Sequence, residues 1–133
     1  MDKAHFFVEV FGRIILVSGL LAANAGITRA DVDCSSIAAC TIPRLDSGYD
    51  PAFQANISGS YHVDADIFLD ASCQTIFDTA SANGSFTGLI TLGYVLEPPL
   101  MSGDVVSWKL RFDGCPQTDC LTAVAGTDIC QGF

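Results

Sequence analysis

Hydrophobic and polar side chains alternate most regularly between Tyr61 and Asp70. One face of this segment is apolar and carries Tyr61, Val63, Ala65, Ile67 and Leu69. The other face carries His62, Asp64, Asp66 and Asp70, with Phe68 as its apolar member. A period of two residues is typical of a β-strand with one buried side. We therefore predict a strand here, with its acidic face open to water.

Two other segments also have strand-like patterns. Val105–Phe112 alternates, so that Trp108 falls on its apolar face while Lys109 and Arg111 fall on the polar one. Phe86–Val95 is apolar on both faces, as expected of a strand that is covered on both sides. Shorter strands are predicted at Thr75–Asp78 and Leu121–Val124.

The dipeptide Asn83-Gly84 gives the strongest short-range turn signal in the chain. A type I′ turn needs positive φ at both central positions, which asparagine and glycine tolerate best. We therefore predict a tight hairpin turn at these two residues, joining Thr75–Asp78 to Phe86–Val95.

Short strands separated by turns, with no amphipathic helical pattern after residue 30, indicate an all-β fold. The predicted architecture is a small antiparallel β-sandwich or barrel stabilised by disulfides. Residues 31–133 are long enough for a single domain. The segment Asp31–Pro51 contains many turn-forming residues, so we expect it to be an irregular opening to the fold.

The first 30 residues are typical of a cleaved secretory signal helix. The apolar run Ile14–Ala23 is followed by Ala23-Asn24-Ala25, a cleavage pattern of small residues. We place the end of the signal peptide at Ala30, with a cut after Ala25 as the alternative. Spanning a bilayer takes about 20 apolar residues, so we expect no stable membrane span in the mature chain. The mature protein would be secreted, or periplasmic in a Gram-negative bacterium.

Loss of the leader would change the charge balance. Residues 31–133 contain thirteen acidic side chains and three basic ones, Arg44, Lys109 and Arg111, which gives a net charge of −10. Nucleic-acid binding depends on Lys and Arg that displace counterions from phosphates. The composition therefore argues against nucleic acids and anionic membranes as partners. The composition does not choose among proteins, glycans and apolar ligands as partners.

Six cysteines follow the leader: Cys34, Cys40, Cys73, Cys115, Cys120 and Cys130. An even number of cysteines in an exported chain predicts disulfide bonds. The simplest pairing joins Cys34 to Cys40, Cys115 to Cys120 and Cys73 to Cys130. Long-range pairing is the alternative, because closing a longer loop removes more entropy from the unfolded chain.

The acidic face of the Tyr61–Asp70 strand offers two interpretations. We expect no cofactor, and the alternative is calcium, because Asp64, Asp66 and Asp70 provide the carboxylate oxygens that Ca²⁺ prefers. Alternatively, pairing with the Val105–Phe112 strand would place these carboxylates opposite Lys109 and Arg111. Opposite charges across strands stabilise by roughly 0.2–1 kcal/mol per pair.

His62 is the one histidine after the leader. A small secreted hydrolase would have to use it together with nearby carboxylates such as Asp64. However, the sequence has no G-x-S-x-G nucleophile motif, and six paired cysteines would leave no thiol. We therefore expect that the protein is not an enzyme and has no catalytic residues. The alternative is a small hydrolase that uses His62 with nearby carboxylates.

Two asparagines lie in N-x-[ST] tripeptides, Asn56 before Ile57-Ser58 and Asn83 before Gly84-Ser85. In a eukaryotic secretory pathway these tripeptides mark glycosylation acceptors on the protein surface. Asn56 and Asn83 are therefore the glycosylation candidates.

Binding sites on β-scaffolds lie mostly on loops. Tyr49 in the turn-rich segment Leu45–Pro51, and Leu100 and Met101 at an apolar tip, are therefore the binding-loop candidates. The sequence predicts a secreted, disulfide-stabilised binding or interaction module with an acidic surface and an unidentified ligand. A toxin-like or inhibitor-like effector is a further alternative.

Overall fold

The computed structural model describes residues 31–133, so the predicted signal peptide and its cut at Ala25 or Ala30 lie outside the described residues. The described chain is an antiparallel β fold without α-helices, as predicted. Its elements are a 3₁₀ turn (Cys34–Ser36), β1 (Ala38–Pro43), β2 (Tyr49–Phe68), β3 (Ile76–Gly93), β4 (Val105–Phe112) and β5 (Leu121–Val124). Within residues 31–133, no helix has the length and apolarity needed to cross a membrane.

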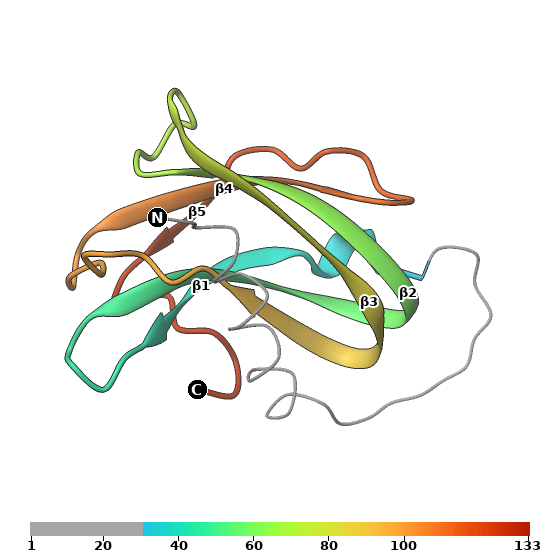
Figure 1. Cartoon of the computed structure of the whole chain (residues 1–133), viewed down its shortest axis with the longest axis horizontal. Helices are drawn as coiled ribbons and strands as arrows, with labels where there is room; N and C mark the ends of the chain where they lie inside the picture. The colour runs from blue at the N-terminus through green and yellow to red at the C-terminus, as the bar shows by residue number, and fades with distance from the viewer. Residues whose placement is uncertain (1–30) are drawn as a thin grey trace.

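β2 and β3 form one long antiparallel ribbon, which turns back on itself so that its two halves face each other (Figure 1). The Tyr94 hydroxyl, just after β3, donates a 2.6 Å hydrogen bond to Asp78 near the start of the strand, 16 residues earlier. A straight strand of that length would separate the two residues by about 50 Å. The curl therefore brings the two ends of β3 together.

Two glycines near the middle of the ribbon have backbone torsions that suit this curl. Gly59 in β2 has φ 142° and Gly88 in β3 has φ 123°. They lie close together across the pair, because Ile57 is opposite Gly88 and Gly59 is opposite Phe86. Such torsions are accessible to glycine without steric cost, so the ribbon can bend here.

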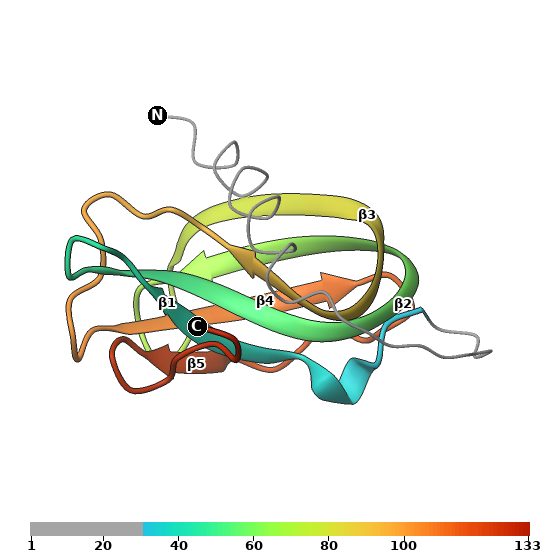
Figure 2. The same cartoon turned by 90° about the horizontal axis from the view of Figure 1, so that it is seen from below.

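The second edge of β2 is covered along most of its length. β1 pairs with its first part, β4 pairs with its last part, and Val32 bridges to Ile57 between them. β5 pairs with β4, and Ile129, in the segment after β5, bridges back to Thr41 in β1 (Figure 2). The result is a curled half-barrel with β3 along one side.

The core lies between the facing halves of the curled sheet. Phe53 from the first half of β2 contacts Trp108 and Phe112 of β4, with ring centroids 4.9 and 6.0 Å apart in edge-to-face geometry. All three rings are fully buried or nearly so. The prediction that Trp108 belongs to the core is confirmed, and edge-to-face pairs of this kind add to the stabilisation from burial.

The predicted strand bounds are confirmed for β4 and β5, but the predicted turn at Asn83–Gly84 is wrong. Asn83 and Gly84 lie inside β3, opposite His62 and Tyr61, and neither has a positive φ. The expected strands on either side of this dipeptide are parts of one continuous strand. β1 was also not expected, because its short sequence lies in a segment rich in turn formers.

The alternation that predicted a strand over Tyr61–Asp70 breaks at its end. The pairing of β2 with β3 skips Phe77 at this point, whereas the pairing of β2 with β4 continues without a shift through Phe68. Phe68 therefore stays on the same face as Asp66, where it is buried opposite the buried Ser107. Leu69, which was expected on the buried face, lies beyond the end of β2 and is exposed.

All six cysteines form disulfides, but the simplest predicted pairing is wrong. The bonds join Cys34 to Cys115, Cys40 to Cys130 and Cys73 to Cys120, across 81, 90 and 47 residues of sequence. Each bond therefore connects distant segments, as the long-range alternative required. Closing long loops restricts the unfolded chain more strongly than joining sequence neighbours.

Candidate binding surface

Polar side chains from three adjacent strands meet on the outer face of the second half of the sheet. Asp64 on β2 lies opposite Arg111 on β4 and, on its other side, opposite Ser81 on β3. Asp66 lies in the same way between Lys109 and Thr79. The predicted pairing of the acidic strand with the basic one is therefore confirmed. We call these six residues the outer polar face.

The charges on the outer polar face are only partly compensated. Arg111 approaches Asp64 to 3.9 Å, and both side chains are about half exposed, at 57% and 45%. An exposed pair of this kind contributes about 0–1 kcal/mol. Asp66 has no hydrogen-bond or ion-pair partner within residues 31–133, although Lys109 is its cross-strand neighbour. This carboxylate is consequently available to a ligand.

An open depression of about 410 Å³ lies on this face, between β2 and β3. Its side chains include Asp64, Asp66, Thr79, Ser81 and Arg111. The short hydroxyl side chains of β3 leave the two carboxylates accessible from the β3 side. The depression thus combines negative charge with hydrogen-bonding groups, a lining that suits a polar or cationic ligand.

His62 lies at the end of the same face. One ring nitrogen, Nδ1, is 3.4 Å from Asp113, and the other, Nε2, is 3.7 Å from Asp64. Across the pair, its neighbour on β3 is Asn83. An imidazole oriented by carboxylates also needs a hydroxyl or thiol nucleophile beside it for covalent hydrolysis. Within residues 31–133 the recorded polar contacts of this ring are to the two carboxylates.

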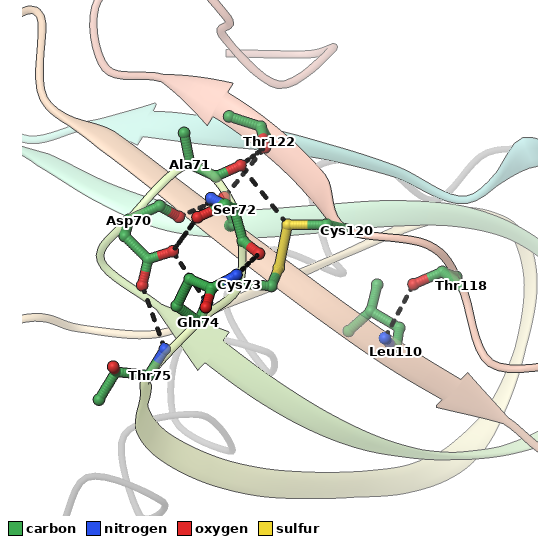
Figure 3. The surroundings of a disulfide bond; sticks show 11 residues. Asp70, Ala71, Ser72, Cys73, Gln74, Thr75, Leu110, Thr118, Cys120 and Thr122 are labelled. Carbon is green, nitrogen blue, oxygen red and sulfur yellow. Dashed lines mark hydrogen bonds between the residues drawn. A yellow bond between two sulfur atoms is a disulfide. The ribbon is translucent and has the colours of Figure 1, made fainter.

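The third calcium candidate, Asp70, is engaged elsewhere. Its carboxylate accepts backbone hydrogen bonds from Ser72, Gln74 and Thr75 in the turn between β2 and β3 (Figure 3). These bonds, with Gln74 as the largest contributor, lower the pKa of Asp70. Residues 31–133 contain no group of three His, Cys, Asp or Glu side chains placed to hold a metal.

The Asp70 turn is also fixed from the other side of the fold. Cys73, with φ 53°, is bonded to Cys120, and the carbonyl of Ala71 accepts from the Thr122 hydroxyl at 3.4 Å (Figure 3). Asp70 therefore acts as a structural side chain that shapes the true β2–β3 turn. The sequence signal for this role is the Asp itself, whose side chain accepts from the backbone N–H two residues later, as in Asx turns.

The expected apolar binding tip is largely folded into the protein. Tyr49 and Leu100 exchange two backbone hydrogen bonds of 2.9 Å, and Leu100 is 5% exposed. The expectation that Leu100 is presented to a ligand is therefore corrected, because its side chain packs into the core. Met101, at 56% exposure, is the one of the three candidates that is open to solvent. Binding at Tyr49 and Met101 stays a prediction.

Both glycosylation candidates have exposed positions on strands. Asn56 lies in β2 and Asn83 in the middle of β3. The expectation that Asn83 is exposed at a hairpin tip is corrected, since it is exposed on a sheet face. Modification of either residue stays a prediction.

Sequence reasoning missed an ion-pair network at the opposite end of β2. Arg44 binds Asp50 at 3.0 Å and Glu97 at 3.0 Å, and also donates to the Leu96 carbonyl. Burial raises the pKa of Asp50, and the hydrogen bond from Arg44 opposes that effect. Burial alone would lower the pKa of Arg44, but its hydrogen bonds and charge interactions with Asp50 and Glu97 raise it. This network is structural, because Asp50 is mostly buried and fully paired.

Comparisons with known proteins give little guidance. No family model matches the sequence, and a search of curated proteins finds no match. Among solved structures, this chain resembles a structure of PhoD with 8% sequence identity and a TM-score of 0.44. The alignment covers 74% of this chain and 20% of the PhoD chain, so this chain spans about a fifth of that protein's length.

Proposed function

We propose that the protein is an extracellular binding module that takes a cationic ligand on its outer polar face. The observation that carries this proposal is the uncompensated Asp66 carboxylate, next to the loosely paired Asp64 and beside an open depression. A carboxylate without a partner attracts cations from solution, and Asp64, two residues away on the same face, adds to this attraction even though Lys109 is the cross-strand neighbour of Asp66. Thr79 and Ser81 would add hydrogen bonds to the ligand.

The three disulfides support the extracellular part of the proposal. Disulfides form and persist in oxidising compartments, which include the extracellular space and the bacterial periplasm. The excess of acidic side chains in residues 31–133 supports the preference for a cationic partner over nucleic acid or an anionic membrane.

A hydrolase that uses His62 is the second candidate. The observation in its favour is the position of the ring between Asp64 and Asp113. The two functions make different demands, because binding depends on Asp66 and hydrolysis would depend on His62. The variant His62→Ala should leave binding of a cationic ligand nearly unchanged, and would abolish hydrolysis of any ester or amide substrate that the wild type cleaves.

Fluorescence anisotropy with a dye-labelled oligolysine peptide would test the binding function. We expect Asp66→Asn to weaken binding severalfold. The matched control is Asp119→Asn, which removes the same charge from an exposed loop position outside the outer polar face. Equal weakening by the two variants would show that binding follows net charge alone, and the proposed site would then be wrong.

A further inference from the structure

The outer edge of β3 has no strand beside it in the part of the chain that the structure describes. Within residues 31–133, β3 pairs with β2 only, and apart from this ladder residues 78–93 make none of the recorded backbone–backbone hydrogen bonds. The strand is 18 residues long. A long open edge presents a row of N–H and C=O groups that can pair with another chain.

The register identifies the backbone groups that face this edge. Just past the end of β3, Tyr94 donates its N–H to Pro51 on the β2 side. Residues alternate in an antiparallel ladder, and the register runs without a shift from Asp78 to Gly93. Every second residue of β3 therefore turns its N–H and C=O away from β2. In the exposed part of the strand these residues are Thr79, Ser81, Asn83, Ser85 and Thr87.

This edge lacks the features that usually protect an open strand. Natural edges are guarded by charged residues, prolines, bulges or a covering loop. From Thr79 to Gly93 the strand contains no charged residue and no proline, and its pairing contains no bulge. None of the three disulfides involves a residue of β3. The edge is therefore chemically ready to accept a strand.

We propose that the open edge of β3 binds an extended segment of another protein, which adds as an antiparallel strand and carries Lys or Arg at every second position. This inference rests on the proposed function, because the same carboxylates select the ligand's charge. Strand addition is an established mode of peptide recognition, in which main-chain hydrogen bonds supply affinity and alternate side chains supply specificity.

The choice of a basic partner follows from the neighbouring strands. In an antiparallel addition, residues opposite Thr79 and Ser81 would place their side chains on the outer polar face. Strands lie about 4.8 Å apart, so these side chains would start roughly 10 Å from the β2 row that carries Asp64 and Asp66. A Lys or Arg side chain is long enough to reach across the short hydroxyl side chains of β3. It would there meet the unpartnered Asp66.

A second copy of this chain is a poorer occupant of the edge. Its own β3 would present Thr, Ser and Asn at the same positions, and none of these could compensate Asp66. It would also bring a second set of residues 31–133 with a net charge of −10 from thirteen acidic and three basic side chains. Like charges on both partners oppose association.

Peptides methylated on chosen backbone nitrogens would test the proposal. The probe is a dye-labelled nine-residue peptide of alternating Lys and Thr with blocked ends. In the proposed geometry, the N–H groups of the Lys residues face β3, and those of the Thr residues face solvent. N-methylation of the Lys residues should weaken binding about tenfold or more, since several main-chain hydrogen bonds are lost. N-methylation of the Thr residues is the matched control and should have little effect.

Two protein variants complete the experiment. Ser81→Pro removes an edge-facing N–H at a position where an edge strand tolerates proline, and should weaken binding of the unmethylated peptide. Asp66→Asn should weaken it severalfold, and should have no effect on a peptide with Thr and Gln in alternation. Circular dichroism would verify that both variants are folded.

The outcomes separate the two proposals. If both methylated peptides bind equally well while Asp66→Asn still weakens binding, strand addition is wrong and the cationic-ligand function stands. If Asp66→Asn does not change the binding of any of the peptides, the cationic-ligand function and strand addition are both wrong. If sedimentation of the protein alone shows a dimer that Ser81→Pro dissociates, the edge pairs with a second copy and the proposed partner is wrong.

Discussion

β2 and β3 are neighbours of nearly equal length, 20 and 18 residues, yet they occupy very different environments. β2 is paired on both edges, by β3 on one side and by β1, Val32 and β4 on the other. β3 has β2 on one edge, and its first twelve residues are mostly exposed. The difference shows that β2 organises the fold, whereas β3 pairs with β2 alone within residues 31–133.

The disulfides sharpen this contrast. One anchors the segment before β1, one anchors β1 itself, and one anchors the turn that precedes β3. The disulfides therefore hold the segments that cover β2 and the turn between β2 and β3. None of them holds β3 itself. Removing contacts from the covered edge of β2 should cost much more stability than removing contacts from β3.

The largest effect is expected from the Cys40–Cys130 bond, which joins β1 to the C-terminal segment across 90 residues. Replacing both cysteines by serine should lower the free energy of unfolding by about 3.5 kcal/mol, because the unfolded chain gains the entropy of an open loop, which the intact Cys34–Cys115 bond shortens. Urea denaturation would measure the loss. The contrasting variant is Ser85→Ala on β3, for which we expect a change within about 0.5 kcal/mol. Similar losses for the two variants would remove the contrast between the strands.

A smaller effect is expected from the two ion pairs of β2. Arg44→Met leaves Asp50, whose side chain is 12% exposed, without its cation, and should cost about 3 kcal/mol. Arg111→Met disrupts the exposed 3.9 Å pair with Asp64 and should cost less than about 1 kcal/mol. Denaturation of both variants under identical conditions compares a buried with an exposed ion pair. Equal costs would contradict the difference in burial.

The pH dependence of Arg44→Met provides a second measurement. Burial already raises the pKa of Asp50, and loss of the Arg44 hydrogen bond should raise it further. A carboxyl group with a raised pKa in the folded state binds more protons there than in the unfolded state. Stability is then lost as pH rises and regained as pH falls. The variant should therefore recover part of its deficit on acidification from neutral pH to about pH 5.

The sequence predicted those strands that have one face buried in the core and the other face in water. β4 and the end of β2 each have one face in the core and one in water, so their alternation revealed both the strand and the cross-strand charges. The sequence predicted two strands in place of β3, because its small polar residues show no clear alternation of hydrophobic and polar side chains and because Asn83-Gly84 suits a turn. The curl of the ribbon overrides that local preference, since tertiary pairing with β2 decides the backbone conformation here.

The candidate site was predictable to the same extent. Asp64, Asp66, Lys109 and Arg111 follow from the pairing of two strands that alternate clearly. Thr79 and Ser81 were missed because their strand was assigned to a turn region. The disulfide partners depend on which distant segments meet in space, and sequence spacing carries no information on that. Leu100 was misjudged for a similar reason, since its pairing with Tyr49 is long-range.

A still smaller effect is expected at the turn that joins the two strands. Backbone hydrogen bonds from Gln74, Thr75 and Ser72 lower the pKa of Asp70, so the folded state binds fewer protons than the unfolded one. Its stabilisation is present above the unfolded pKa of about 3.9 and is lost as pH falls through the folded pKa. Asp70→Ala should therefore be less stable than the wild type at neutral pH, and the difference should shrink as pH falls through the folded pKa of Asp70. Asp119→Ala is the control, and a difference that persists in acid would contradict this role of the carboxylate.

Hydrogen exchange should resolve the two edges of β3 without altering the protein. The N–H groups of Thr79, Ser81, Asn83, Ser85 and Thr87 face the open edge, so we expect their amide hydrogens to exchange quickly. Those of the intervening residues bond to β2 and should exchange slowly, giving an alternating pattern along the strand. Over Val63–Phe68, β2 has β3 on one edge and β4 on the other, so the amide hydrogens that face either edge should exchange slowly. Amide exchange followed by NMR would measure this pattern. Uniform protection of β3 would mean that its outer edge is occupied, and a reversed alternation would overturn the register on which strand addition depends.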